Sequence, residues 1–123
     1  MTRQNGIKIA GILGMFFLLL TANLVQAGAA KPLDAPADAA GAGHNAEGIK
    51  HFNMGMWDNA ELHFKGAVKE NDKLAEAHYN LALALDKLGN HKDATKHFAE
   101  ANKLGASNPA IANSEILKKH LGM

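Results

Sequence analysis

Residues 75–108 read AEAHYNLALALDKLGNHKDATKHFAEANKLGASN, and this stretch decides the fold. When residues 41–74 are aligned with it at an offset of 34, seven positions are identical, against about two or three expected from composition. The identical pairs are His44/His78, Gly55/Gly89, Ala60/Ala94, His63/His97, Phe64/Phe98, Ala67/Ala101 and Lys69/Lys103. A period of 34 residues indicates a repeated helical hairpin, so two copies account for most of the chain.

Turn-forming and capping residues mark the helix ends in each copy. Gly55 and Gly89 are able to take the positive φ that ends a helix. Asp58 and Asn90 are expected to cap the second helix of each copy, each together with the acidic residue three positions later, Glu61 or Asp93. A last helix is expected to begin at Pro109, with Asn108 as its N-terminal cap. The expected helices span residues 45–54, 58–70, 73–88, 90–104 and 109–121.

The second copy resembles a tetratricopeptide repeat. The positions that carry the resemblance are Leu81, Ala82, Leu85, Gly89, Ala94, Phe98, Ala101 and Leu104. The resemblance implies an all-α fold, a short α-solenoid in which two helix-turn-helix repeats, at residues 41–74 and 75–108, precede a C-terminal capping helix at residues 109–121. The first copy has Glu47 and His51 where the second has leucines, so its first helix is expected to be a degenerate end of the array.

The first 27 residues have the order of a secretory signal peptide. Arg3 and Lys8 precede an apolar run of 12 residues, 9–20, and Val25-Gln26-Ala27 follows a more polar stretch. An apolar run of about 7–15 residues is typical of a signal peptide and is too short to span a bilayer. We therefore expect cleavage after Ala27 and export, with the periplasm as the location. The alternative is an uncleaved membrane anchor at residues 7–25.

Residues 28–43 consist almost entirely of Ala, Gly, Pro and Asp, with Leu33 as the single larger aliphatic residue. Such a composition buries too little apolar surface to offset the entropy of ordering the chain. We therefore expect a flexible spacer at residues 28–43, ahead of a folded domain at residues 44–123.

Charge and cysteine content exclude several classes of function. The chain has 13 basic and 12 acidic residues, and removal of residues 1–27 takes away Arg3 and Lys8, which leaves 11 against 12. Arg3 is the one arginine, so the exported chain would have no guanidinium and no basic excess with which to bind nucleic acid. The sequence has no cysteine, which excludes disulfides, thiolate metal sites and cysteine catalysis.

Seven histidines make a metal site the most specific chemical hypothesis. No two of them have the four-residue spacing that places ligands on one helical face, and there is no HExxH motif. We interpret them as dispersed inter-helix and surface residues and expect no metal or other cofactor; a periplasmic histidine-dependent metal-binding protein is the alternative. No Ser, His and Asp combination has a strand-turn-helix context, so we expect no enzyme.

The tetratricopeptide resemblance implies a concave groove lined by the first helices of the two repeats. The expected groove residues are Asn45, Ile49, Phe52, Asn53, Tyr79, Asn80, Leu83, Asp86 and Lys87. Four of them, Ile49, Phe52, Tyr79 and Leu83, form an apolar strip, which is either a partner-binding surface or core beneath the C-terminal helix. The predicted function is a non-catalytic interaction module or scaffold in the cell envelope that binds a protein, a peptide or a second copy of the chain. A membrane is a partner only if the N-terminal segment stays uncleaved.

Overall fold

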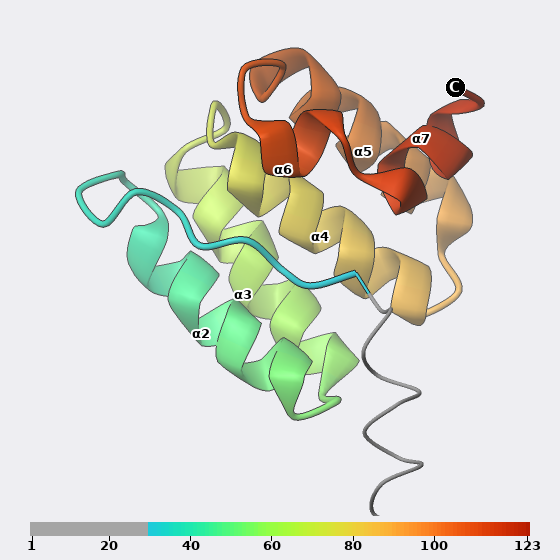
Figure 1. The fold of residues 1–123 in the computed structure, drawn as a ribbon. Coiled ribbons are helices and arrows are strands. Elements are labelled where there is room, and N and C mark those ends of the chain that lie inside the picture. Colours follow the sequence, from blue (N-terminus) through green and yellow to red (C-terminus); the bar gives the residue numbers. More distant parts are fainter. Residues whose placement is uncertain (1–29) are drawn as a thin grey trace, which may run out of the picture.

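The structure, a computed structural model, describes residues 30–123, which form an extended N-terminal segment, two helical hairpins and a short C-terminal helical segment (Figure 1). The helices are α2 (Ala42–Asn53), α3 (Trp57–Glu70), α4 (Ala75–Lys87), α5 (His91–Leu104), α6 (Pro109–Ala112) and α7 (Glu115–Leu121). The expected signal peptide, residues 1–27, lies outside the described residues. No helix within residues 30–123 combines the length and the apolar character needed to cross a membrane.

Each hairpin pairs a first helix with a second one, as the 34-residue period predicts. Helix α2 packs on α3 and α4 packs on α5, while contacts between α3 and α4 join the two hairpins. Gly55 and Gly89 have φ values of 75° and 81° after α2 and α4, in the left-handed region that glycine enters without steric cost. The expected all-α fold with two helix-turn-helix units is therefore confirmed.

Small residues lie where the helices of a hairpin cross. An added Cβ at Gly48 in α2 would collide with the ring of Phe64 in α3. In the second hairpin Ala82 and Phe98 take the corresponding positions, and both have no exposed surface. A small side chain on one helix thus leaves room for the phenylalanine of the next, which keeps the crossing densely packed.

The cap of α5 agrees with the sequence analysis, whereas the cap of α3 does not. Asn90 accepts a hydrogen bond from the Asp93 backbone N–H at 3.4 Å, and its amide donates to the Asp93 carboxylate at 3.1 Å. The expected capping pair of Asp58 and Glu61 is wrong, because α3 begins at Trp57 and has no side-chain cap. Asp58 lies inside the first turn instead. Its negative charge there still stabilises the helix, because it lies near the positive end of the helix dipole.

The C-terminal segment is two short helices rather than the single helix expected at residues 109–121. Helix α6 ends at Ala112, and the Ser114 hydroxyl starts α7 by accepting a hydrogen bond from the Leu117 N–H at 3.4 Å. Ile111 and Leu117 are both fully buried, although six residues of a continuous helix would place them on different faces. Core packing therefore favours the break over helix continuity.

Residues 30–36 are not the flexible spacer that composition predicts. They form an extended segment, the strap, which lies across α2 and α4 (Figure 1). Leu33 packs against the main apolar cluster and Ala35 against a smaller one. A turn closed by a hydrogen bond from the Ala39 N–H to the Pro36 carbonyl, 3.0 Å, leads toward α2. Composition misses the strap because it counts apolar surface, whereas the strap is held largely by main-chain hydrogen bonds to buried amides.

Candidate functional site

An asparagine pair on the first helices of the two hairpins holds the strap by its main chain. Asn80 in α4 accepts a hydrogen bond from the Leu33 N–H at 2.7 Å and donates one to the Leu33 carbonyl oxygen at 2.8 Å. Asn45 in α2 donates to the same carbonyl oxygen at 3.0 Å. The second N–H of the Asn80 amide donates to the Asn45 side-chain oxygen at 2.8 Å. We call this pair the Asn45–Asn80 clamp.

Burial makes the bonds of the clamp important for folding. Asn45 is 1 % exposed and Asn80 is 0 % exposed, and a buried polar group that loses its partner costs about 1–3 kcal/mol. The main chain of Leu33 supplies partners that both amides need. Since the clamp contacts only backbone atoms of Leu33, these bonds do not depend on the side chain at that position.

The apolar strip is core in the structure and not an open groove. Phe52, Tyr79 and Leu83 are 7 %, 3 % and 2 % exposed, and Ile49 is half-buried against the same cluster. The C-terminal segment covers one end, where the Tyr79 and Ser114 hydroxyls share a hydrogen bond of 2.8 Å. Burial raises the pKa of the Tyr79 phenol above its ordinary value of 10.0. Of the two interpretations that the sequence leaves open, the structure agrees with core.

The polar residues expected around the groove have different surroundings. Asn53 is exposed, and so is Lys87, whose Nζ lies 5.5 Å from the centre of the Trp57 ring in a cation–π contact. Asp86 is half-buried and is bonded by two histidines, one from α5 and one from α7. The expected groove residues therefore separate into a clamp, a core strip, an exposed edge and a histidine-bound carboxylate.

The histidines gather in groups rather than being dispersed. In the first hairpin His44 Nδ1 lies 3.4 Å from His63 Nδ1, and the His51 ring stacks on that of His63 with centroids 5.1 Å apart. In the second hairpin His78 Nδ1 lies 3.1 Å from His97 Nδ1. The repeat thus places one histidine pair, 19 residues apart in sequence, between the two helices of each hairpin.

The second of these pairs is an inter-helix contact between two ring nitrogens, and a backbone partner indicates which of them donates. His78 Nε2 donates to the Asp72 carbonyl oxygen at 2.8 Å, so in the neutral ring its Nδ1 accepts from His97 Nδ1–H. Burial, and then the neighbouring His78, lower the pKa of His97. Both effects disfavour a positive charge on His97 between α4 and α5.

Asn45 and Asn80 are both among the expected groove residues, but their pairing is not predicted. They are 35 residues apart, one more than the repeat period, so the alignment of the copies does not pair them. The packing of Leu33 is also not predicted, because composition places it in a spacer. The available signal for it is that Leu33 is the one larger aliphatic residue of this stretch and lies between Pro32 and Pro36. The same 19-residue spacing between two histidines occurs in both copies. This repeated spacing could have predicted the histidine pairs, whereas the sequence analysis interprets the histidines as dispersed.

Comparison with known proteins supports the assignment of the second hairpin. Residues 75–107, which span α4 and α5, match the family model described as Tetratricopeptide repeat. No curated protein and no solved structure shows a significant match to the chain. The match falls on the same copy that carries the resemblance in the sequence, and the structure adds a packed hairpin before it.

Proposed function

Because the chain is a tetratricopeptide-repeat protein, of a family that typically serves protein–protein interaction, we propose that it binds a protein partner and catalyses no reaction itself. The observation that carries this proposal is the Asn45–Asn80 clamp, which holds the N–H and the carbonyl of one residue in an extended segment. In this proposal an extended peptide of the partner takes the place that the strap holds in the structure.

The surroundings of Leu33 suggest which peptide would fit. Its side chain packs against the apolar cluster, and the strap around it consists of prolines and small residues apart from Lys31 and Asp34. The clamp supplies main-chain bonds, while the surface beneath Leu33 supplies a preference for an aliphatic side chain. Because the strap is part of the chain, it competes at an effective concentration in about the millimolar range.

A strap-weakened variant tests the proposal with the strap sequence itself as the probe. Leu33→Pro removes the N–H that donates to Asn80, which costs the strap about 1–3 kcal/mol. A fluorescent peptide with the sequence of residues 30–38 should then bind this variant about tenfold more tightly than the unaltered chain, since about 1.4 kcal/mol corresponds to tenfold. Fluorescence anisotropy measures both affinities.

Two controls separate release of the strap from general damage. Ala37→Pro introduces the same residue at the second position of the turn that Ala39 closes on Pro36, where proline is favoured, and should leave peptide binding at the wild-type level. Asn80→Ala added to Leu33→Pro should abolish the gain. Equal binding to the variants with and without Asn80 would show that the clamp is not the binding site.

We further propose that the protein works in the cell envelope after export. The support is the order of the N-terminal sequence, with basic residues first, a 12-residue apolar run next and Ala27 at the expected cleavage position. Cleavage there would make Gly28 the first residue, two positions before the strap. Intact-mass measurement of the protein from an envelope extract tests this proposal, and a mass that includes residues 1–27 would favour the membrane anchor.

A further inference from the structure

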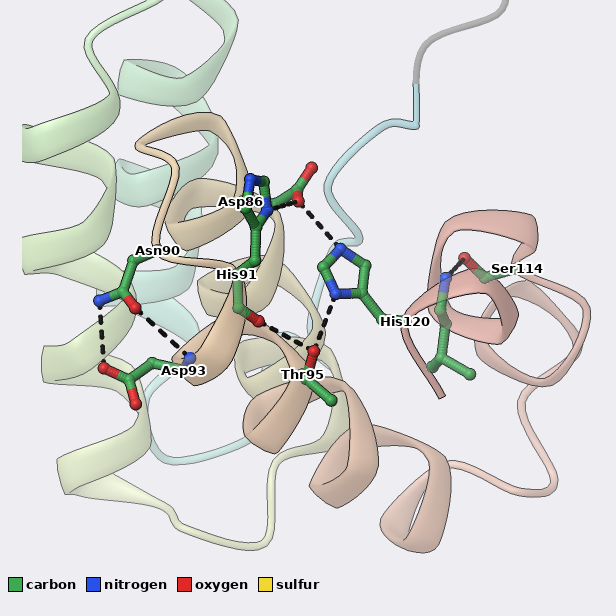
Figure 2. Close-up of polar contacts among 8 residues, drawn as sticks. Asp86, Asn90, His91, Asp93, Thr95, Ser114 and His120 are labelled. Carbon is green, nitrogen blue, oxygen red and sulfur yellow. Dashed lines mark hydrogen bonds and ion pairs between the residues drawn. The ribbon is translucent and has the colours of Figure 1, made fainter. Parts of the chain in front are cut away.

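Three side chains that bind metals well converge at the junction of α4, α5 and α7 (Figure 2). Asp86 Oδ1 lies 2.8 Å from His91 Nδ1 and 2.9 Å from His120 Nε2. All three ligand atoms lie within 4.8 Å of one another, and within residues 30–123 no other group of three or more such residues is as close. Ligands of a tetrahedral zinc site are about 3.3 Å apart, so small side-chain rotations would fit them around an ion.

Thr95 decides which nitrogen of His120 faces the carboxylate. The Thr95 hydroxyl donates its one hydrogen to the His91 carbonyl oxygen at 2.9 Å. Its oxygen therefore accepts from His120 Nδ1–H, also at 2.9 Å. Figure 2 draws the contact between these two side chains as a dashed line. This leaves the Nε2 lone pair of a neutral His120 directed at Asp86. Histidines that ligate metals typically hold their other N–H in a bond of this kind.

Two lone-pair atoms 2.9 Å apart repel each other, and a metal ion bound between His120 Nε2 and the Asp86 carboxylate would replace this repulsion with two favourable contacts. Asp86 also lies in the last turn of α4, at the negative end of the helix dipole, where a bound cation is favoured. His91 directs a second ring nitrogen at the same oxygen, which a single imidazolium–carboxylate pair does not require.

We propose that Asp86, His91 and His120 bind a divalent transition-metal ion of the zinc, cobalt, nickel or copper class. Two imidazoles and a carboxylate suit these ions, whereas Mg²⁺ and Ca²⁺ prefer sites made of oxygen ligands. The ion joins α7 to the second hairpin through one ligand from each of three helices. The site is separate from the Asn45–Asn80 clamp and does not depend on the proposed peptide binding.

The site has an open side. A hollow of about 410 Å³ adjoins it, lined by the three ligands together with Ile116 and Lys119. The side chain of His91 is 68 % exposed and that of His120 is 12 % exposed. Three protein ligands with one open position leave room for water or an exogenous ligand. The ammonium of Lys119 on this side favours an anionic fourth ligand.

Titration of the full chain, produced without a polyhistidine tag and stripped with a chelator, tests the proposal. Calorimetry with Zn²⁺ should show one saturable site per chain, and Co²⁺ should give a visible absorption spectrum that titrates to the same endpoint. Asp86→Asn and His91→Gln should each remove the site. His63→Gln, in the histidine group of the first hairpin, is the matched control and should keep it. Thr95→Val should retain the site with about 10- to 100-fold weaker affinity, as expected for a residue that orients a ligand.

The test uses variants of Asp86 and His91, whose side chains are half-buried and exposed. His120 is not replaced, because it packs against the ring of Phe98 and its replacement would also disturb the core. Circular dichroism of Asp86→Asn and His91→Gln should match the wild-type spectrum. Two results would overturn the proposal: no saturable Zn²⁺ binding to the unaltered chain, or binding that survives both Asp86→Asn and His91→Gln. Either result would show that Asp86, His91 and His120 form a hydrogen-bonded group that binds no metal ion.

Discussion

Replacement of Asn80 by alanine tests how strongly the clamp holds the strap. The change leaves the Leu33 N–H and the Asn45 side-chain oxygen without the partner that each has in the structure, while the Leu33 carbonyl keeps its bond from Asn45. Each orphaned buried group costs about 1–3 kcal/mol, but the strap is able to lift and admit water to both. Alanine also has the higher helix propensity, by roughly 0.5 kcal/mol. We therefore expect a net loss of about 2 kcal/mol in the free energy of unfolding.

Urea unfolding followed by circular dichroism measures this loss, and Asn53→Ala is the matched control because Asn53 is an exposed asparagine of α2. The control should change the free energy of unfolding by less than about 0.5 kcal/mol. For a domain of this size a loss of about 2 kcal/mol lowers the melting temperature by roughly 10 °C. Hydrogen exchange of the Leu33 amide should also quicken in Asn80→Ala. Equal midpoints for the two variants, with equal protection of that amide, would refute the reasoning.

Three further predictions concern the core and its histidines. Ala94→Leu should overpack the crossing of α4 and α5 and cost about 1–3 kcal/mol, whereas Lys92→Leu on the exposed face should cost little; equal shifts in a thermal melt would contradict the crossing. Burial, then His78, lowers the pKa of His97 from its model-compound value of 6.5, so the unfolded chain takes up a proton first as the pH falls. Stability should therefore decline below about pH 6.5, and melts at a series of pH values should show a flatter decline for His97→Gln. Changing Phe52 and Leu83 together to serine should abolish the helical circular dichroism signal, since both are buried; a retained signal would show that the strip is not core.

The structure agrees with the sequence-based predictions where the determinants of structure are local. The turns at Gly55 and Gly89 require a positive φ, which the residue type itself permits. The Asn90 cap depends on residues three positions apart, and the structure confirms it. The capping pair predicted at Asp58 failed because a one-residue shift of the helix start removes the geometry, and such a shift lies within the usual uncertainty of helix ends.

By itself the sequence determined the two hairpins, because a 34-residue period, glycine turns and paired small and aromatic residues act over one or two helices. Only the tertiary structure decided what lies against the first helices and what surrounds Asp86. Leu33 and Asn80 are 47 residues apart, and Asp86 and His120 are 34 residues apart; no helical or strand periodicity relates residues at such separations. These contacts depend on where the strap and α7 come to rest against hairpins already formed, and that placement is set by the burial of Leu33 and Leu117 and by the partners that buried amides require.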